Sequence, residues 1–282
     1  MIVNAINMLN KAKNEKKAVP QFNINNLEWT RYILESCDEA NSPVILGASE
    51  GAIKYMGGYK TVFNLVKSLV EDLNITVEVA IHLDHGSSVD SCKKAIEAGF
   101  TSVMFDGSKL PLFENIEKIK EVINFAKQFN VSVEGEIGQI GGEEDNHKAT
   151  ILYADKEDCD VFVKETNVDF LAAGLGSVHG LYKEEPNLQY DLMKKIATST
   201  NIPIVLHGGT GIPDNQIKKA IENGISKINI NTELQVVWSK AIREFIKQNE
   251  EVYDPRKIIN SGKNAVKSAV REKIELFGTN KL

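Results

Sequence analysis

Three of the five histidines in the chain, His85, His179 and His207, are each followed directly by a glycine. Three imidazole ligands around an open position are typical of a catalytic zinc site. The trio contains no carboxylate, which favours zinc over iron. Any one of these histidines alone would more often be a structural residue held by hydrogen bonds. The sequence therefore predicts a metal site, on condition that the fold brings the three together.

Two further polar residues accompany His85 in the stretch AIHLDHGSS, residues 80–88. A carboxylate such as Asp84 beside a Lewis-acidic metal can move a proton to or from a substrate oxygen. The alternative is a structural role for Asp84, either as a helix N-cap or as a hydrogen-bond acceptor for a metal ligand. His82 has the strand parity of Asp84, so we expect it to hydrogen-bond within the fold or to support a ligand. We expect His147, in a polar loop, to be solvated.

Glycine-rich stretches suggest a second kind of site. Backbone N–H groups in HGGTG (207–211), GSVHGLYK (176–183) and NINT (229–232) could hold a phosphate, together with a helix N-terminus. HGGTG alone often marks only a tight turn, and its position beside a predicted ligand strengthens it. In GQIGGEEDN (138–146), glycines flank carboxylates, which suits a lid that brings a base to a substrate; a solvated acidic loop is the alternative.

Eight apolar runs of strand length would have to position these residues, and segments of helical periodicity alternate with them. The runs are 19–24, 43–49, 77–85, 101–108, 131–138, 169–177, 203–209 and 226–231, and the helical segments are 27–40, 59–73, 89–98, 115–129, 155–166, 191–199 and 214–223. This alternation predicts an α/β fold with a buried parallel sheet, closed as a (β/α)₈ TIM barrel; a doubly wound open sheet is the alternative. In a barrel the carboxyl ends of the strands meet at one mouth, where the three histidines fall.

The remaining segments extend this barrel without adding a second domain. We expect residues 1–11 to form a short helix across the barrel floor and residues 233–282 to form a C-terminal helical extension, interrupted at 253–257. Nothing in the composition marks a linker. The sequence therefore predicts a single domain over residues 1–282.

Composition excludes several classes of partner. The net charge is −6 with no basic run, and the sequence pI is about 5.5, which argues against nucleic acid. The chain has no apolar run of about 18 residues and no apolar core of a secretory signal near Met1, so we expect no membrane partner and a cytoplasmic location. Cys37, Cys92 and Cys159 are odd in number and widely spaced, which indicates reduced thiols.

Five motifs in this order, AIHLDHGSS, GEIGQIGGEED, GSVHGLYKEEPNL, LHGGTGIP and KININTELQ, resemble the class II, metal-dependent fructose-1,6-bisphosphate aldolases over almost the whole chain. The resemblance implies a zinc-dependent (β/α)₈ lyase of glycolysis and gluconeogenesis. Such an enzyme reversibly cleaves fructose 1,6-bisphosphate to dihydroxyacetone phosphate and glyceraldehyde 3-phosphate, with zinc as the Lewis acid for the enediolate. A sodium or potassium ion near the phosphate and a homodimer or homotetramer are also implied.

The matching motifs carry residue roles. By resemblance, the zinc ligands are His85, His179 and His207, and Glu136 can contact the metal in an alternative position. Asp84 resembles the proton donor to the hydroxyl at the cleaved bond, and Glu144 resembles the base that acts on the triose carbon. Asn229 approaches the reacting carbons. The implied substrate positions are Asn23, Ser49, Gly180, Lys183, Gly208, Gly209, Thr210, Asn229, Asn231, Thr232, Asp254 and Arg256.

Three rivals follow from the same residues. Tagatose-1,6-bisphosphate aldolase shares the fold and the metal; Asn231 favours the fructose substrate, whereas Gln235 stands where some fructose enzymes have a basic residue. A Schiff-base aldolase needs a lysine inside a barrel strand, and Lys227 is expected at the starting end of the last strand, the wrong end. A non-catalytic sensor on the same barrel would lack Asp84 or the lid carboxylates, and both are present.

Overall fold

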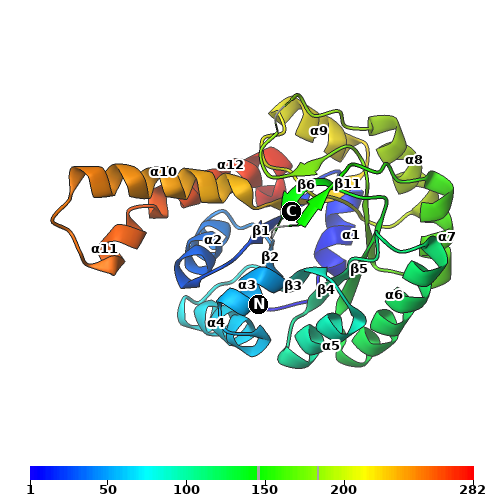
Figure 1. Cartoon of the computed structure of the whole chain (residues 1–282), viewed down its shortest axis with the longest axis horizontal. Helices are drawn as coiled ribbons and strands as arrows, with labels where there is room; N and C mark the ends of the chain where they lie inside the picture. Colours follow the sequence, from blue (N-terminus) through cyan, green and yellow to red (C-terminus); the bar gives the residue numbers. More distant parts are fainter. Residues whose placement is uncertain (145–146, 183) are drawn as a thin grey trace.

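The computed structural model describes residues 1–144, 147–182 and 184–282, and only the backbone of residues 143–144, 147–149 and 281. Within these residues, parallel strands close a barrel in the order β1-β11-β10-β8-β5-β4-β3-β2 (Figure 1). The eight strands of the barrel are β1 (Val19–Asn23), β2 (Val44–Ser49), β3 (Val79–Gly86), β4 (Ser102–Phe105), β5 (Ser132–Ile137), β8 (Phe170–Ala173), β10 (Ile204–Leu206) and β11 (Ile225–Ile230). The predicted barrel is confirmed, and the open sheet is excluded.

Helices surround the barrel, and the seven that follow the first seven barrel strands lie close to where the apolar periodicity predicts them (Figure 1). They are α2 (Leu27–Glu39), α4 (Tyr59–Asp72), α5 (Val89–Ala98), α6 (Leu112–Ala126), α7 (Lys156–Thr166), α8 (Tyr190–Thr200) and α9 (Asp214–Glu222). Local signals set their ends: a capping box at Ser88 starts α5, and Gly99 in the left-handed conformation ends it. The sequence did not predict the short α3 (Glu50–Tyr55), which Ser49 caps.

The floor of the barrel is closed by α1 (Ile6–Glu15), as predicted for the N-terminal segment. Its buried residues pack against a layer of inward-facing apolar side chains, which are Val19, Ile45, Ala80, Met104, Phe170, Ala172 and Val205. Because strand side chains alternate with a period of two, the next inward positions toward the carboxyl ends are 21, 82, 134 and 227, and then 23, 84, 136 and 229. These positions are polar and buried, so chemistry is confined to the upper half of the barrel.

The C-terminal extension consists of α10 (Thr232–Gln248), α11 (Pro255–Asn260) and α12 (Lys263–Phe277). Figure 1 shows α10 and α11 reaching away from the barrel as an arm, while α12 returns to it. The base of the arm is fixed by Trp238, whose ring lies 5.2 Å from that of Trp29 in α2. Lys267 of α12 forms ion pairs with Glu35 and Glu39 of α2, which ties the extension to the barrel helices.

A small second sheet includes part of the segment predicted to be a loop at 138–146. It has the order β7-β6-β9 and comprises β6 (Gly141–Glu144), β7 (His147–Ala149) and β9 (Val178–His179). Strand β6 pairs in parallel with β9, and Gly142 lies opposite His179. The acidic segment is therefore connected by strand pairing to one of the three histidines, a contact that the sequence pattern did not indicate.

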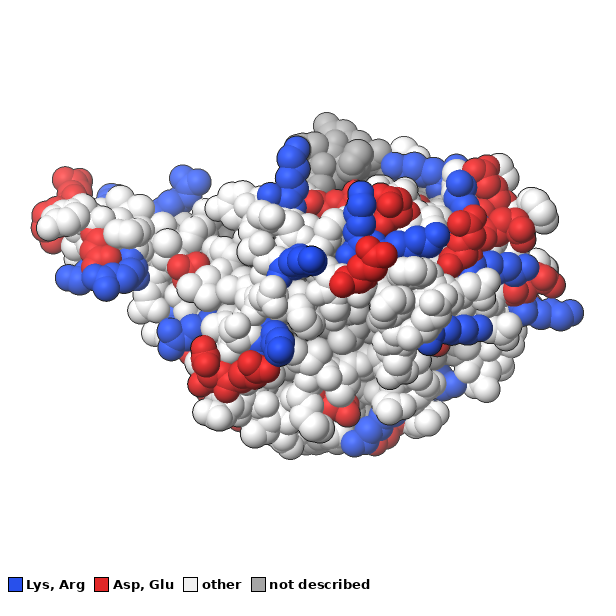
Figure 2. Space-filling model, turned by 90° about the horizontal axis from the view of Figure 1, so that it is seen from below, with Lys and Arg blue, Asp and Glu red and all other residues white. Residues whose placement is uncertain are grey.

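The charges on the surface and the state of the cysteines agree with what the sequence predicts. On the face drawn in Figure 2, Lys and Arg side chains lie among Asp and Glu side chains, with wide uncharged areas between them. Among the described residues, no helix combines the length and the apolar character that a membrane span requires. Cys37, Cys92 and Cys159 are free and buried.

Candidate metal centre

The three histidines singled out by the sequence converge at the mouth of the barrel. His85 lies at the end of β3, His179 in β9 and His207 directly after β10, and one ring nitrogen from each lies within 4.8 Å of the others. His85 has a φ of 51°, a left-handed conformation that is uncommon for a residue other than glycine. This backbone turn takes His85 out of the strand alternation and accompanies its approach to the other two rings.

Two carboxylates orient two of these rings. Glu134 Oε1 lies 2.8 Å from His207 Nε2, and Asp106 Oδ2 lies 3.0 Å from His85 Nδ1. Burial lowers the pKa of His207 although Glu134 opposes the shift, so the ring is neutral at pH 7. If each ring donates its proton to its carboxylate, the remaining nitrogens, which lie 2.9 Å apart, face each other with lone pairs. That arrangement suits a cation bound between them.

A second group of donors adjoins the histidines and consists of His85, Asp106 and Glu136, again within 4.8 Å. Oε2 of Glu136 is buried and has no hydrogen-bond partner among the described residues. Burial and the neighbouring Asp106 raise the pKa of Glu136 well above its usual value. Sequence reasoning missed Asp106, although it directly follows a strand and precedes a glycine, as His207 does.

Asp84 is buried beside the histidines and is held by two amides. Its Oδ2 accepts a hydrogen bond of 2.8 Å from Asn23 Nδ2, and Asn229 Nδ2 lies 3.5 Å from its Oδ1. Burial alone would raise the pKa of Asp84, but the neighbouring imidazoles of His85 and His207 and the ammonium group of Lys227 outweigh burial and lower it. The side chain is therefore a carboxylate at neutral pH, positioned next to the converging imidazole rings.

A backbone cradle lies beside His207. Gly208 has a φ of 64°, and a Cβ there would lie 2.2 Å from the carbonyl oxygen of Val178, so only glycine fits. Thr210 Oγ1 accepts a hydrogen bond from the backbone N–H of Glu233, which joins this loop to the first turn of α10. Helix α10 begins at Thr232, directly after Asn231. The loop after β10 and a helix N-terminus thus lie side by side, as an anion site requires.

Tyr182 fastens the two loops that carry His179 and Gly208. Its hydroxyl accepts a hydrogen bond of 3.0 Å from the backbone N–H of Val178 and donates one of 3.0 Å to the carbonyl oxygen of Gly208. Burial raises the pKa of Tyr182 to about 12, so the hydroxyl keeps its proton. Sequence reasoning missed Tyr182, because a tyrosine in a loop has no pattern of its own.

The other predicted substrate residues fall in two places. Ser49 lies opposite Asp84 in the register of β2 and β3, and Gly180 follows His179 with a φ of 89°. Asp254 and Arg256 instead form an ion pair of 2.9 Å at the start of α11, far out on the arm in Figure 1, so one chain does not bring them to its own histidines. Lys183 and the side chain of Glu144 lie outside the described residues.

Lys227 lies in the starting half of β11, opposite Val19, as expected, but its side chain points into the barrel, which the sequence analysis did not foresee. The side chain is fully buried inside the barrel, and its Nζ lies 2.8 Å from Glu134 Oε2 and 2.9 Å from Asn229 Oδ1. Lys227 shares the inward parity of Asn229, and that parity, which the sequence contains, would have placed it correctly. His82 lies on the same inner layer and hydrogen-bonds Ser102 Oγ through Nδ1 at 2.7 Å, which confirms its predicted place within the barrel.

Comparison with known families supports the same conclusion over nearly the whole chain. The family described as "Fructose-bisphosphate aldolase class-II" matches residues 3–281. The chain belongs to this family. Proteins from two bacteria, both named fructose-bisphosphate aldolase, are similar to it. The protein of Geobacillus stearothermophilus is 55% identical over 279 residues, which cover 99% of this chain and 97% of that protein. For Staphylococcus aureus (strain Mu50 / ATCC 700699) the identity is 52% over 279 residues, with coverage of 99% and 98%.

A solved structure extends the likeness to the fold. The crystal structure of the YdjI aldolase from Escherichia coli K12 superposes with a TM-score of 0.86 at 32% sequence identity, and the match covers 99% of this chain and 98% of that chain.

The residues of the metal centre fit the zinc that the class II aldolase family implies. Three imidazoles converge, two of them lie within hydrogen-bond distance of carboxylates, and Glu136 presents a buried oxygen that has no hydrogen-bond partner among the described residues. Zinc in catalytic sites is bound by imidazole nitrogens whose rings are oriented by hydrogen bonds to carboxylates.

Proposed function

We propose that the protein is a zinc-dependent aldehyde-lyase that reversibly cleaves fructose 1,6-bisphosphate to dihydroxyacetone phosphate and glyceraldehyde 3-phosphate. The observation that carries the proposal is the convergence of His85, His179 and His207 beside the buried carboxylate of Asp84, in a chain of the class II family. A glycine cradle for phosphate adjoins the same mouth.

In this proposal, the side chains around the histidines handle the protons. When bound at the histidines, zinc supplies Lewis-acid polarisation of the substrate carbonyl. Asp84 accepts the proton of the hydroxyl at the cleaved bond and returns it in the condensation direction, a role that its buried position beside the histidines and Asn229 supports. Asn229 lies between Asp84 and His207 and positions the reacting carbons, and Glu144 serves as the base at the triose carbon.

Backbone groups bind the phosphate ends of the substrate. We assign the phosphate of the triose half to the cradle and its neighbours, namely Gly180, Lys183, Gly208, Gly209, Thr210, Asn231 and Thr232. Asn23 and Ser49, on the strands beside Asp84, face the other half of the substrate. A sodium or potassium ion bound by backbone carbonyls near the phosphate completes this assignment, and Glu136 is an alternative contact for the metal.

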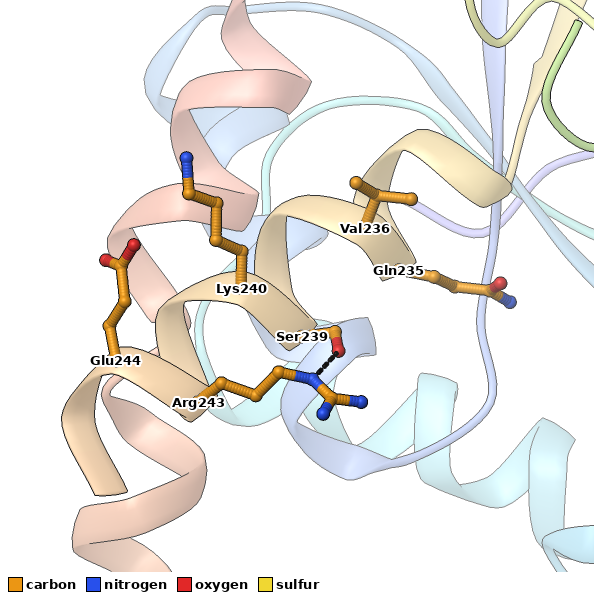
Figure 3. Close-up of a pocket in the computed structure, with 6 residues that line it drawn as sticks. All are labelled: Gln235, Val236, Ser239, Lys240, Arg243 and Glu244. Carbon is orange, nitrogen blue, oxygen red and sulfur yellow. Dashed lines mark hydrogen bonds between the residues drawn. The ribbon is translucent and has the colours of Figure 1, made fainter. Parts of the chain in front are cut away.

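We also propose that the protein is a homodimer or homotetramer in which Asp254 and Arg256 serve a neighbouring mouth. They lie near the outer end of the arm, next to Tyr253, which is 91% exposed. A surface groove also runs along the arm, as Figure 3 shows; it is lined by Gln235, Val236, Ser239, Lys240, Arg243 and Glu244. Contact with another chain would cover these residues and bring Arg256 close to a bisphosphate.

The proposed organisation is one domain over residues 1–282 in the cytoplasm. The closed barrel and the return of α12 to α2 support the single domain. Three free cysteines suit a compartment in which thiols stay reduced.

The deciding experiment compares cleavage of the fructose and tagatose bisphosphates by the zinc-loaded protein. We expect faster cleavage of the fructose substrate, loss of activity on chelation and its return with zinc. Faster cleavage of the tagatose bisphosphate would make it the substrate in place of fructose 1,6-bisphosphate and would leave the proposed zinc mechanism unchanged.

A borohydride experiment separates the zinc mechanism from Schiff-base chemistry. We expect no trapped adduct in the presence of substrate, because Lys227 is enclosed in the barrel and donates to Glu134 and Asn229. A lysine trapped on substrate would contradict the zinc mechanism.

A further inference from the structure

Lys227 lies in a polar layer of the barrel interior, one inward position below Asn229 and His207. Its ammonium group is completely removed from solvent. An unpaired buried charge is strongly destabilising, and an apolar side chain of similar volume is often as stable as a buried ion pair. The position of this charge is therefore better explained by what it holds than by stability alone.

The first contact of Lys227 leads to the metal centre. Its Nζ donates to Oε2 of Glu134 at 2.8 Å, and the other oxygen of that carboxylate, Oε1, lies 2.8 Å from Nε2 of His207. Burial alone would raise the pKa of Glu134, but Lys227 and His207 outweigh it and hold the pKa at about 2, so the group is a carboxylate. Lys227 thus fixes the carboxylate that fixes the His207 ring.

The second contact leads to the proposed site of proton transfer. The same Nζ donates to Oδ1 of Asn229 at 2.9 Å, which assigns this atom as the oxygen and turns the Nδ2 group toward the mouth. There Nδ2 lies 3.5 Å from Asp84 Oδ1 and 3.2 Å from His207 Nδ1. If Oδ1 of Asn229 lost this donor, its amide could rotate and would no longer present N–H groups to Asp84 and the substrate.

We propose that Lys227 is a positioning residue that sets two groups of the site at once: the ring of His207, through Glu134, and the amide of Asn229, directly. The expected loss of kcat on removal of Lys227 rests on the proposed aldolase function. The effect on metal binding follows from the geometry of His207 whatever the substrate is.

Lys227→Met tests the proposal in the full-length protein, because methionine has a similar length and no donor. We expect the zinc dissociation constant, measured on apoprotein by competition with a chromophoric chelator, to rise about 10- to 100-fold. At saturating zinc, we expect kcat to fall on the order of 100-fold with little change in KM, because the reacting groups are misaligned. The exposed Lys94→Met is the matched control and should match the parent in both measurements.

Single-arm variants separate the two contacts. Glu134→Gln should weaken zinc binding, because it changes the group that orients the His207 ring. Asn229→Ala should lower kcat at saturating zinc and leave zinc affinity intact. In the double variant Lys227→Met/Asn229→Ala, kcat should be no lower than in Asn229→Ala alone, because both substitutions remove the same hydrogen bond between Lys227 and Asn229. Additive losses of kcat, or a folded Lys227→Met protein with parental zinc affinity or parental kcat, would overturn the proposal.

Lys227→Met alone could misfold, because it leaves the Glu134 carboxylate buried without its cation. A double variant without either charge provides a second test. Glu134→Gln/Lys227→Met removes both charges and keeps an acceptor for His207. We expect this protein to fold and to lose kcat as Lys227→Met does, and parental kcat would overturn the proposal. If the parent protein cleaves neither bisphosphate, the proposed function fails, whereas zinc competition still tests the link to His207.

Discussion

Asp84 and His85 are adjacent in the chain and differ in what their loss should do. Asp84 is held by Asn23 and Asn229 and is not a member of either group of potential metal ligands. We expect Asp84→Ala to retain zinc and to lose turnover by about 10²- to 10⁴-fold, the range for removal of a proton-transfer group. His85→Ala should lose zinc as well, because His85 belongs to both groups. Zinc content and kcat, measured on the same preparations, check both outcomes.

His82 provides the contrast for this experiment. It is buried one inward position below Asp84, and its ring is bound to Ser102. Burial and Lys227 lower the pKa of His82 to about 3, so it is a neutral structural ring. We expect His82→Ala to keep its zinc. If His82→Ala lost its zinc and His85→Ala kept it, His82 would be the metal ligand and His85 the structural residue.

Residue types that stand out in sequence were easy to find, and their partners were not. The three histidines could be predicted because imidazoles at strand ends before glycines are rare. Glu134 and Lys227 sit within apolar runs, where a charged residue looks like an error of strand assignment. Only the closed barrel, which places opposite strands within a few ångströms, shows that the two charges neutralise each other.

At the scale of elements, the Tyr182 hydroxyl joins β9 to the loop after β10. Tyr182→Phe would leave the Val178 N–H without its acceptor and the Gly208 carbonyl without this donor. We expect a loss of about 1–3 kcal/mol in the free energy of unfolding, and a higher KM for the bisphosphate because the cradle is less well held. Tyr190→Phe on α8, whose ring contact with Lys219 the phenyl group keeps, is the control. An unchanged KM in Tyr182→Phe would show that the cradle does not depend on this bond.

The junction of α2 with the C-terminal extension should make stability depend on pH. Burial alone would raise the pKa of Glu35, but hydrogen bonds from Lys263 and Arg31 outweigh it and lower the pKa to about 2. Because the folded pKa is below the usual value of 4.5, the carboxylate contributes fully above about pH 4.5, and the contribution is lost as pH falls toward 2. We expect urea unfolding of apoprotein to show Glu35→Gln as less stable than the parent at pH 6, with the difference shrinking by pH 3. A constant difference over this range would contradict the assignment.

Elements with strong periodicity were predicted well, and short ones were missed for a physical reason. The barrel strands and outer helices bury an apolar face, which leaves a repeating pattern in the sequence. The sheet of β6, β7 and β9 is held by backbone pairing between glycine-rich and acidic segments, which leave no such pattern. It nevertheless carries His179, so the least predictable element positions one third of the proposed ligand set.

At the scale of the whole molecule, the arm separates residues that one active site would need. Arg256 lies at the start of α11, with its side chain 89% exposed, whereas the histidines lie in the barrel mouth. If the arm of one chain serves the mouth of another, each site contains His85 from one chain and Arg256 from its neighbour. We expect Arg256→Ala alone to raise KM about 10-fold or more, by loss of a charge-assisted bond to phosphate.

Mixing two impaired proteins tests this arrangement directly. His85→Ala and Arg256→Ala each damage every site of their own homo-oligomer. After subunit exchange, a mixed dimer has one site that combines intact His85 from the Arg256→Ala chain with intact Arg256 from the His85→Ala chain. We therefore expect the mixture to cleave fructose 1,6-bisphosphate at limiting concentration faster than the sum of the two proteins assayed apart. A strictly additive rate in a mixture that sedimentation shows to have exchanged subunits would place Arg256 outside the neighbouring site.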